Sequence, residues 1–385
     1  MSNQFKLLPT DREDPDVAPC LLCAFPKLVA FPIPRMEEVV GRAWLDDAGI
    51  VDGVTSREHI SFSRTGSRLH IKDHRSQNGT FVDAIRLEPE VETRIDDGAI
   101  IRIGQTIFVY RERFPLKNAP EPPLGELVAP WGFRQIRQDL FARTYRPGLN
   151  VLLDGRIGTG KESLAKEVAQ ILRPGTKFVP VNLATIPRDH YEATLFGWEQ
   201  NTFTGAFRKN EGFLRSAANG TVFLDEIEAL PVDLRPKLLR FLDQRESQAV
   251  GSRAGPQSTD CLVIAATNHS PEELLAKDAF RADLLARFQL RLKLPALNDR
   301  PEDLFAIIAS RWQRVHGNLE QNIPRVDAEA IERLMLQDWP DDVRGLFRFL
   351  DSLAPRTGLT KSALYKLKPI ETPAPPSKRG TGEDR

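Results

Sequence analysis

Short apolar runs separated by polar turn residues fill the first third of the chain. Two dipeptides between such runs, Asn78-Gly79 and Asp97-Gly98, are strong turn signals. Many short strands at close spacing predict a β-sandwich or barrel. The runs with the composition of strands are Lys27–Phe31, Ser67–Lys72, Gly79–Val82, Ile100–Ile103 and Thr106–Tyr110.

The pattern changes after a proline-rich stretch. Prolines 115, 120, 122, 123 and 130 favour an extended, semi-rigid linker over residues 115–130. Beyond it, amphipathic helical stretches alternate with apolar runs at Asn150–Asp154, Thr221–Asp225 and Cys261–Ala265, as they do around the parallel strands of an α/β sheet. The later part of the chain shows only helical periodicity until a proline-rich end.

These patterns predict a multidomain protein, a β-sandwich followed by an α/β domain with a helical region. The expected segments are an N-terminal extension (1–17), the β-sandwich (18–114), the linker (115–130), the α/β domain (131–296), the helical region (297–355) and a tail (356–385).

Composition excludes several classes of protein. The 53 basic and 53 acidic residues cancel, so no overall charge attracts the chain to nucleic acid or to a membrane. Three cysteines are too few for a disulfide framework, and Cys20-Leu-Leu-Cys23 lacks further ligands for a tetrahedral metal site, so we expect plain strand residues. The N-terminus is polar and acidic, and no apolar run is long enough to span a bilayer. We therefore expect a cytoplasmic location.

The strongest chemical signal is a glycine-rich loop that follows the predicted strand Asn150–Asp154 and matches GxxxxGK. Its glycines let backbone N–H groups surround phosphates, the following helix adds a positive dipole, and Lys161 adds a charge. Glu162 stands where a magnesium-binding Ser or Thr is usual. The predicted nucleotide-binding residues are Gly155, Arg156, Ile157, Gly158, Thr159, Gly160, Lys161, Glu162 and Ser163.

Two later strands also end in polar side chains. Thr221–Asp225 is followed by Glu226, so Asp225 is placed to hold magnesium, directly or through water, and Glu226 to activate the attacking water. An acidic pair after a strand can instead cap a helix, but its place after the glycine-rich loop favours chemistry. The third strand leads to Asn268, where an amide can sense a γ-phosphate.

From Trp131 to about Leu350 the chain resembles the AAA+ domain of bacterial sigma-54-dependent transcription activators (enhancer-binding proteins). That family's loop reads GTGKE, which accounts for Glu162. Leu195-Phe-Gly197, then Phe203-Thr204-Gly205-Ala206, then Gly220 to Ile227 resemble its LFG…GAFTGA…GTLFLDEI. The resemblance implies an ATPase that uses ATP and Mg²⁺ and assembles as a ring of six or seven subunits. It also implies that Phe203, Thr204, Gly205 and Ala206 contact sigma-54.

Further roles follow from the same resemblance. Asn182 corresponds to the asparagine that restrains Glu226 until ATP is sensed. Arg281 and Arg287 lie in a segment resembling FRxDLxxRL, whose arginines reach the γ-phosphate of the neighbouring subunit. Arg344 lies in a segment resembling WPGNVREL and corresponds to a nucleotide-sensing arginine of the helical lid.

The chain also departs from the family pattern. Asn201-Thr202 replaces Gly-Ala at the base of the sigma-54 loop, and Leu262 replaces an arginine before the sensor asparagine. Asp341-Asp342 replaces Gly-Asn, and Gly345 replaces a glutamate. None of these removes a catalytic group, but they bear on how ATP turnover is coupled to loop movement.

In the β-rich region, Val40-Gly41-Arg42, Ser56-Arg57-Glu58-His59 and Ser76 to Thr80 occupy predicted loops. Arginine offers bidentate phosphate recognition, and Ser and Asn offer neutral hydrogen bonds. With Asp97 to Gly104, the array resembles the forkhead-associated (FHA) domain, which reads phosphothreonine. The resemblance implies phosphate or peptide contacts from Arg42, Ser56, Arg57, Asn78, Gly79 and Thr80, with His59 propping the loops. A domain retained only for intramolecular docking is the alternative.

The C-terminal tail is the weakest part of the resemblance. Family members commonly end in a Fis-type helix-turn-helix, and Gly358 to Lys368 faintly resembles its recognition helix. Supporting helices lack room, and seven basic against three acidic residues give weak non-specific attraction at most. We expect weak or indirect DNA contact.

The sequence thus predicts an ATP-hydrolysing transcription activator that remodels sigma-54 RNA polymerase holoenzyme, regulated by a phosphothreonine protein and without a membrane partner. One alternative is a non-enzymatic phosphoprotein adaptor whose ATPase core is degenerate. Another is an AAA+ remodeller of a different protein, against which the intact Phe203–Ala206 sequence argues.

Overall fold

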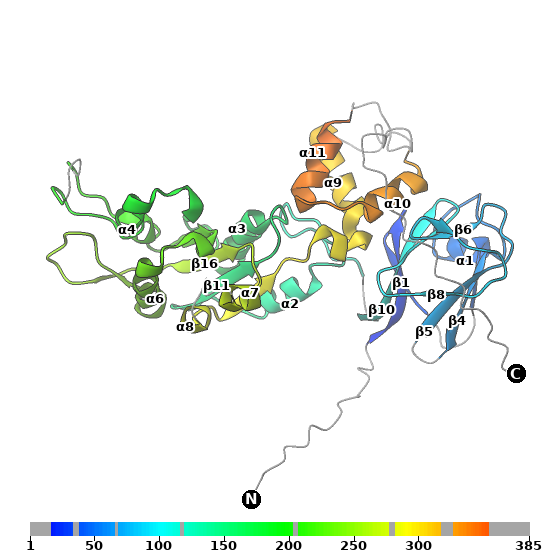
Figure 1. Cartoon of the computed structure of the whole chain (residues 1–385), viewed down its shortest axis with the longest axis horizontal. Helices are drawn as coiled ribbons and strands as arrows, with labels where there is room; N and C mark the ends of the chain where they lie inside the picture. Colours follow the sequence, from blue (N-terminus) through cyan, green and yellow to red (C-terminus); the bar gives the residue numbers. More distant parts are fainter. Residues whose placement is uncertain are drawn as a thin grey trace, which may run out of the picture. The chain divides into compact units, whose positions relative to one another are not determined.

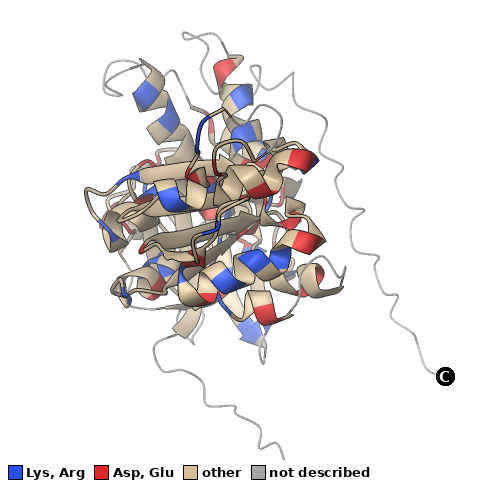
Figure 2. Cartoon of the chain, turned by 90° about the vertical axis from the view of Figure 1, so that its left-hand side faces the viewer, with Lys and Arg blue, Asp and Glu red and all other residues tan. Residues whose placement is uncertain are grey.

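The computed structural model describes residues 17–33, 38–65, 68–115, 119–202, 207–276, 282–316 and 326–353. It divides into two compact units. The first comprises residues 1–120, 301–338 and 353–385, and the second residues 121–300 and 339–352. Figure 1 colours the elements along the chain, and Figure 2 shows basic and acidic residues interspersed on the visible elements, in keeping with their equal totals.

The first unit contains the predicted β-sandwich. A six-stranded sheet has the order β2-β1-β10-β9-β6-β7, a four-stranded sheet has the order β3-β4-β5-β8, and the neighbouring strands are antiparallel. The strands are β1 (Val17–Phe25), β2 (Val29–Pro32), β3 (Glu38–Val40), β4 (Ile60–Thr65), β5 (Arg68–Asp73), β6 (Thr80–Val82), β7 (Ile85–Arg86), β8 (Thr93–Ile95), β9 (Ile100–Ile103) and β10 (Thr106–Pro115).

Apolar side chains from both sheets meet in one core, which includes Leu21, Ile71 and Phe108. Cys20 and Cys23 are free, buried residues of β1, as predicted. Burial raises the pKa of the Cys20 thiol to about 11, so it stays protonated and unreactive. One local prediction was wrong: Arg42 begins a short helix, α1 (Arg42–Asp47), instead of lying in a loop.

The second unit is built on a parallel five-stranded sheet of order β12-β13-β16-β11-β17. Two of its strands have the predicted bounds, and the third begins one residue later than predicted and ends two residues later. The strands are β11 (Asn150–Asp154), β12 (Phe178–Asn182), β13 (Thr221–Asp225), β16 (Leu262–Thr267) and β17 (Leu290–Lys293). A small antiparallel pair consists of β14 (Glu246–Ser247) and β15 (Gln257–Ser258).

Helices cover both faces of this sheet. On one face α2 (Arg134–Phe141) and α3 (Lys161–Leu172) contribute to a buried apolar cluster. A second cluster includes residues from five further helices, α4 (Tyr191–Phe196), α5 (Gly212–Ser216), α6 (Arg235–Gln244), α7 (Pro271–Ala276) and α8 (Ala282–Leu285). The sheet is therefore buried on both faces, which explains the continuous apolar runs of its central strands.

Three helices follow, and they do not form one block. The helices α9 (Leu304–His316) and α10 (Ala328–Leu336) belong to the first unit with the β-sandwich, whereas α11 (Asp342–Asp351) belongs to the second. The short turn η6 (Pro301–Asp303) precedes α9. None of the helices in the described part of the chain is long and apolar enough to cross a membrane. The predicted tail from residue 356 lies outside the described residues.

Candidate functional site

The carboxyl ends of β11, β13 and β16 lie at one edge of the parallel sheet and bring the three polar motifs together, as such edges do in open α/β sheets. The glycine-rich loop connects β11 to α3, and α3 begins at Lys161. The Nζ of Lys161 donates to Oδ1 of Asn268, 2.8 Å away, immediately after β16. Lys161 is thereby joined to the predicted sensor residue.

The backbone of the loop requires glycine. Gly158 and Gly160 have φ values of 86° and 102°, in the region that favours glycine. A Cβ on Gly158 would lie 2.0 Å from the carbonyl oxygen of Asp341, and the N–H of Arg344 donates to the Gly158 carbonyl over 3.3 Å. Arg344 of α11 is therefore beside the loop, where the resemblance places it.

Lys161 is buried, and its ammonium group is held by the loop itself. Besides Asn268, it donates to the carbonyl oxygens of Gly155 at 2.7 Å and Arg156 at 3.0 Å. Burial lowers the pKa of Lys161, while the nearby carboxylates of Asp225 and Glu228 oppose this shift. A phosphate group at this position would favour the charged form of the lysine.

The acidic pair lies at the end of β13, next to Asn182 at the end of β12. Asn182 is paired with Asp225 in the sheet register, and its Nδ2 is 3.4 Å from Oε1 of Glu226. Glu226 adopts a left-handed backbone conformation with φ of 53°, and its N–H donates to Asp225 Oδ1 at 3.0 Å. Burial raises the pKa of Asp225, against this hydrogen bond and the charge of Lys161. The contact expected between Asn182 and Glu226 is therefore present.

The residues at this edge fit a magnesium nucleotide. Mg²⁺ is usually held by one or two carboxylates together with phosphate oxygens and waters. Asp225 supplies such a carboxylate, and no group of three or more His, Cys, Asp or Glu residues that could hold a metal ion occurs in the described ranges. Glu162, by contrast, forms an exposed ion pair of 2.8 Å with Lys166 on α3.

Two further acidic residues support the site, and the contacts that they make were not predicted from the sequence. Oε1 of Glu228 accepts from the N–H of Asn268 at 3.2 Å, which fixes the backbone of the sensor residue. Asp342 is buried with φ of 51°, and its Oδ2 accepts from the N–H of Leu297 at 3.0 Å. Asp tolerates this conformation well, which accounts for the Asp-for-Asn departure at position 342. Neither residue stands within a motif that marks its partner.

The two predicted neighbour-reaching arginines differ in what the structure describes. Arg281 lies outside the described residues. Arg287 follows α8, and its Nε is 2.8 Å from Oδ1 of Asp243 on α6. Its side chain remains 45% exposed, so it is accessible to another molecule.

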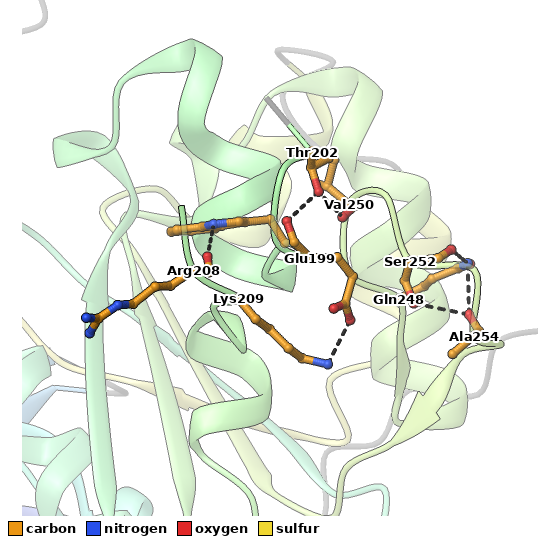
Figure 3. A network of polar contacts seen from close by, with 9 residues as sticks. Glu199, Thr202, Arg208, Lys209, Gln248, Val250, Ser252 and Ala254 are labelled. Carbon is orange, nitrogen blue, oxygen red and sulfur yellow. Dashed lines mark hydrogen bonds and ion pairs between the residues drawn. The ribbon is translucent and has the colours of Figure 1, made fainter. Parts of the chain in front are cut away.

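The predicted sigma-54 loop, Phe203–Ala206, also lies outside the described residues, but its two flanks are described. Before the loop, the N–H of Glu199 donates to the Val250 carbonyl at 3.0 Å, and the Val250 N–H donates to the Gly197 carbonyl at 2.9 Å. After it, Lys209 forms an ion pair of 2.7 Å with Glu199. The flank before the loop is thus held against the segment that follows β14, and the flank after the loop is held against the first flank (Figure 3).

Thr202 makes this fixation specific to the chain. Its hydroxyl donates to the carbonyl oxygens of Glu199 and Val250 (Figure 3). Gln248 and Ser252 in the neighbouring segment donate to the carbonyl of Ala254. The alanine found at position 202 in the family lacks a hydroxyl, so this departure adds polar contacts at the base of the loop.

In the β-sandwich, the predicted phosphate-reading residues converge on residues 53–56. Arg42 donates from Nε to the Thr55 carbonyl at 3.0 Å and from Nη2 to the Gly53 carbonyl at 3.1 Å. Asn78 Nδ2 donates to the Val54 carbonyl at 2.6 Å. The side chains of Arg42, Arg57 and Asn78 are exposed. Arg42 and Asn78, from two separate segments, therefore contact the same stretch of backbone, and the exposed Arg57 follows that stretch directly.

His59 connects these segments from below. It is fully buried; its Nδ1 accepts from the Ser56 N–H at 3.1 Å, and its Nε2 lies 3.3 Å from the Gly79 carbonyl. This pairing assigns the hydrogen to Nε2 and makes the ring neutral, in line with burial lowering the pKa of His59. His59 thus contacts both the Ser56 and the Gly79 segments, which agrees with the supporting role that the resemblance implies.

Thr80 corrects one expectation. It is fully buried, and its hydroxyl donates to Oδ2 of Asp73 at 2.5 Å, so it has no surface for a ligand and instead supports the loop. Asp73 also accepts from the N–H and hydroxyl of Ser76, at 2.9 and 2.6 Å. These hydrogen bonds outweigh burial and lower the pKa of Asp73. In the sequence, Asp73 is only an acidic residue that follows the predicted strand Ser67–Lys72, and nothing indicates these contacts.

Comparison with known proteins matches residues 133–293 to the family model of the sigma-54 interaction domain and residues 39–104 to that of the FHA domain. The chain is 36% identical over 242 residues to the DNA-binding transcriptional regulator NtrC of Rhizobium meliloti, covering 62% of this chain and 50% of that protein. It is 40% identical over 199 residues to the DNA-binding transcriptional activator HyfR of Escherichia coli, covering 51% of this chain and 29% of that protein.

A similar solved structure is that of NtrX from Brucella abortus in complex with ADP, with a TM-score of 0.54 and 26% identity, covering 66% of this chain and 57% of that one. The chain spans half or less of the length of NtrC and HyfR. The FHA match lies within the first structural unit and the sigma-54 match lies within the second. Each unit is the one that contains the motifs of the matching family. The chain therefore carries an FHA domain and, after it, a sigma-54 interaction domain, which is an ATPase domain of the AAA+ class.

Proposed function

We propose that this protein hydrolyses ATP to remodel sigma-54 RNA polymerase holoenzyme, and that its FHA domain regulates this activity by binding a phosphothreonine protein. The observation that carries the proposal is the meeting of Lys161, Asn268, Asp225, Glu226 and Asn182 at one edge of the parallel sheet. This meeting supports the proposal because it brings together the residues to which we assign phosphate binding, charge neutralisation and activation of water.

In this proposal the loop amides and Lys161 bind the phosphates, and Asp225 holds Mg²⁺, which neutralises charge on the phosphoryl group. Glu226 orients and deprotonates the attacking water, and Asn268 senses the γ-phosphate through its link to Lys161. Asn182 holds Oε1 of Glu226 away from the water until that sensing occurs. Arg281 and Arg287 complete the site of a neighbouring subunit in a ring of six or seven.

Open-complex formation at a sigma-54 promoter, with purified chain, holoenzyme and ATP, tests the function. We expect the full chain to form open complexes and to capture sigma-54 in the presence of a transition-state nucleotide analogue. Thr204→Ala should leave ATP hydrolysis largely intact and abolish both. Hydrolysis without capture by the wild-type chain would identify a remodeller of another protein, whereas absent hydrolysis would identify a phosphoprotein adaptor.

Phosphothreonine reading is tested at Arg42, whose guanidinium is exposed beside Asn78 and residues 53–56. We expect Arg42→Ala in the full chain to weaken binding of a phosphothreonine peptide library by about 1.5–3 kcal/mol, the range for charge-assisted hydrogen bonds. Arg113→Ala, at an exposed position of β10, is the matched control and should bind normally. Calorimetry should find no binding of the unphosphorylated library, and equal affinity for both libraries would reject the reader.

A further inference from the structure

Two strands of the FHA domain are buried on both faces. In a sandwich one face of each sheet normally meets solvent, which produces alternating burial. In β1, however, every residue from Cys20 to Phe25 is buried, and in β10 Ile107, Phe108 and Val109 are each 0% exposed. Leu21, Cys23 and Phe108 belong to the core between the two sheets, so something else covers Leu22, Ala24, Ile107 and Val109.

The covering elements are the helices α9 and α10. Within this unit α9 packs on β1, and α10 packs on β9 and β10 (Figure 1). Phe25 of β1 meets Phe305 of α9 edge to face, with ring centroids 4.8 Å apart. The side-chain oxygen of Gln105 accepts from the N–H of Ala328, at the start of α10, over 3.1 Å. The outer face of the FHA sheet is thus a docking surface already occupied by this chain.

Two buried ion pairs fix that contact. Arg102 of β9 lies 2.7 Å from Glu332 of α10, with the side chains 13% and 1% exposed. Arg111 of β10 binds both carboxylate oxygens of Glu302 in η6, at 3.1 and 2.6 Å, with 17% and 6% exposure. Buried charges without partners are strongly destabilising, so each arginine holds its helical partner in one position.

The loop that carries Asn78 and Gly79 is followed directly by a strand that contacts the first of these ion pairs. Asn78 and Gly79 precede β6, whose Phe81 is paired with Arg102 in the sheet register and lies 3.9 Å below its guanidinium. The turn after β6 reaches the same helix, because the N–H of Ala84 donates to Oε1 of Glu332 at 3.3 Å. Phe81, which contacts the arginine paired with Glu332, therefore lies three positions after Asn78 in the chain.

We propose that the outer face of the FHA sheet is an intramolecular docking surface that holds α9 and α10, and that phosphothreonine binding acts on ATP hydrolysis through this contact. The second part rests on the proposed function. Beyond α10 the polypeptide itself connects this contact to the nucleotide site. The helix α11 begins six residues after Leu336, and it carries Arg344, which lies beside the glycine-rich loop. Binding at Asn78 and Arg42 thereby changes the hold on Glu332 and the position of α10.

The docking itself is tested without any phosphopeptide. The double variant Arg102→Met, Arg111→Met keeps an unbranched, flexible side chain at both positions and removes both pairs in the full chain. We expect hydrogen exchange of α9 and α10 amides to become at least about tenfold faster, because the docked state is no longer fixed. Arg94→Met is the matched control, since its pair with Asp96 is 53% and 75% exposed, and exchange should stay at the wild-type rate. Unchanged exchange of α9 and α10 in a folded double variant would overturn the docking.

The regulatory part is tested by the ATPase response. In the wild-type chain a phosphothreonine peptide library should change the hydrolysis rate, and the unphosphorylated library should not. In the double variant the library should still bind, as measured by calorimetry, while the change in rate disappears. A response that persists when α9 and α10 are released would overturn the coupling. Absent binding to the wild-type chain would refute the phosphothreonine function and hence the coupling, but the exchange result would still decide the docking.

Discussion

We expect the Glu226→Gln chain to bind ATP like the wild type and to hydrolyse it about 10²–10⁴ times more slowly, the contribution typical of a general base. The substitution keeps the size of the side chain and the oxygen that faces Asn182 Nδ2 at 3.4 Å. It removes only the capacity to take a proton from water. Lys161 and the loop amides, to which the proposed function assigns phosphate binding, are unaffected, so affinity and rate should separate.

Fluorescent nucleotide binding and phosphate release measure the two quantities. Glu192→Gln is the matched control, because Glu192 is a partly exposed residue of α4 paired with Lys237 at the surface. Exposed pairs contribute little, so this variant should hydrolyse ATP at the wild-type rate. Comparable hydrolysis by Glu226→Gln and the control would contradict the assignment of Glu226 as the base.

The meeting of the three polar motifs was predictable because each is a short motif at a strand end. The glycine-rich loop, Asp225-Glu226 and Asn268 each follow a buried apolar run, and the ends of parallel strands meet at one edge of a sheet. Glu228 supports that edge from outside the motifs, through a hydrogen bond to the backbone of Asn268. Sequence spacing does not predict such a contact, because glutamate side chains and backbone N–H groups are both common in loops.

The docking of α9 and α10 on the FHA sheet was not predictable in the same way. Glu302 and Glu332 are charged residues in helical sequence, for which a solvent-exposed position is the ordinary expectation. Their arginine partners lie 191 and 230 residues earlier in the chain. Periodicity reports local structure and carries no signal for pairs this distant. The unbroken apolar run Cys20–Phe25 was the available sign, since a strand exposed on one face would alternate.

The second large effect concerns assembly. We expect Arg287→Ala to lower the rate of ATP hydrolysis by about 10³–10⁵, as the loss of an arginine that stabilises the transition state does in related enzymes. Its half-exposed guanidinium contacts Asp243 within the chain, so the substitution removes only a surface ion pair and should leave folding intact. The matched control is Arg240→Ala, because Arg240 lies on the same helix as Asp243 and the substitution removes only its exposed pair with Glu246. This variant should retain the wild-type rate.

Mixing distinguishes a residue that acts on a neighbour from one that acts on its own nucleotide. In a mixed ring, an Arg287→Ala subunit still has Glu226, and a Glu226→Gln neighbour still has Arg287, so that interface contains a complete site. Two nearly inactive proteins should therefore regain hydrolysis when combined, and the specific activity of the wild type should rise with protein concentration. If the mixture has no more than the summed activity of its parts, or if Arg287→Ala alone hydrolyses ATP normally, Arg287 does not complete a neighbour's site. Recovery on mixing requires both residues at one nucleotide from two chains, which destabilisation of either variant does not produce.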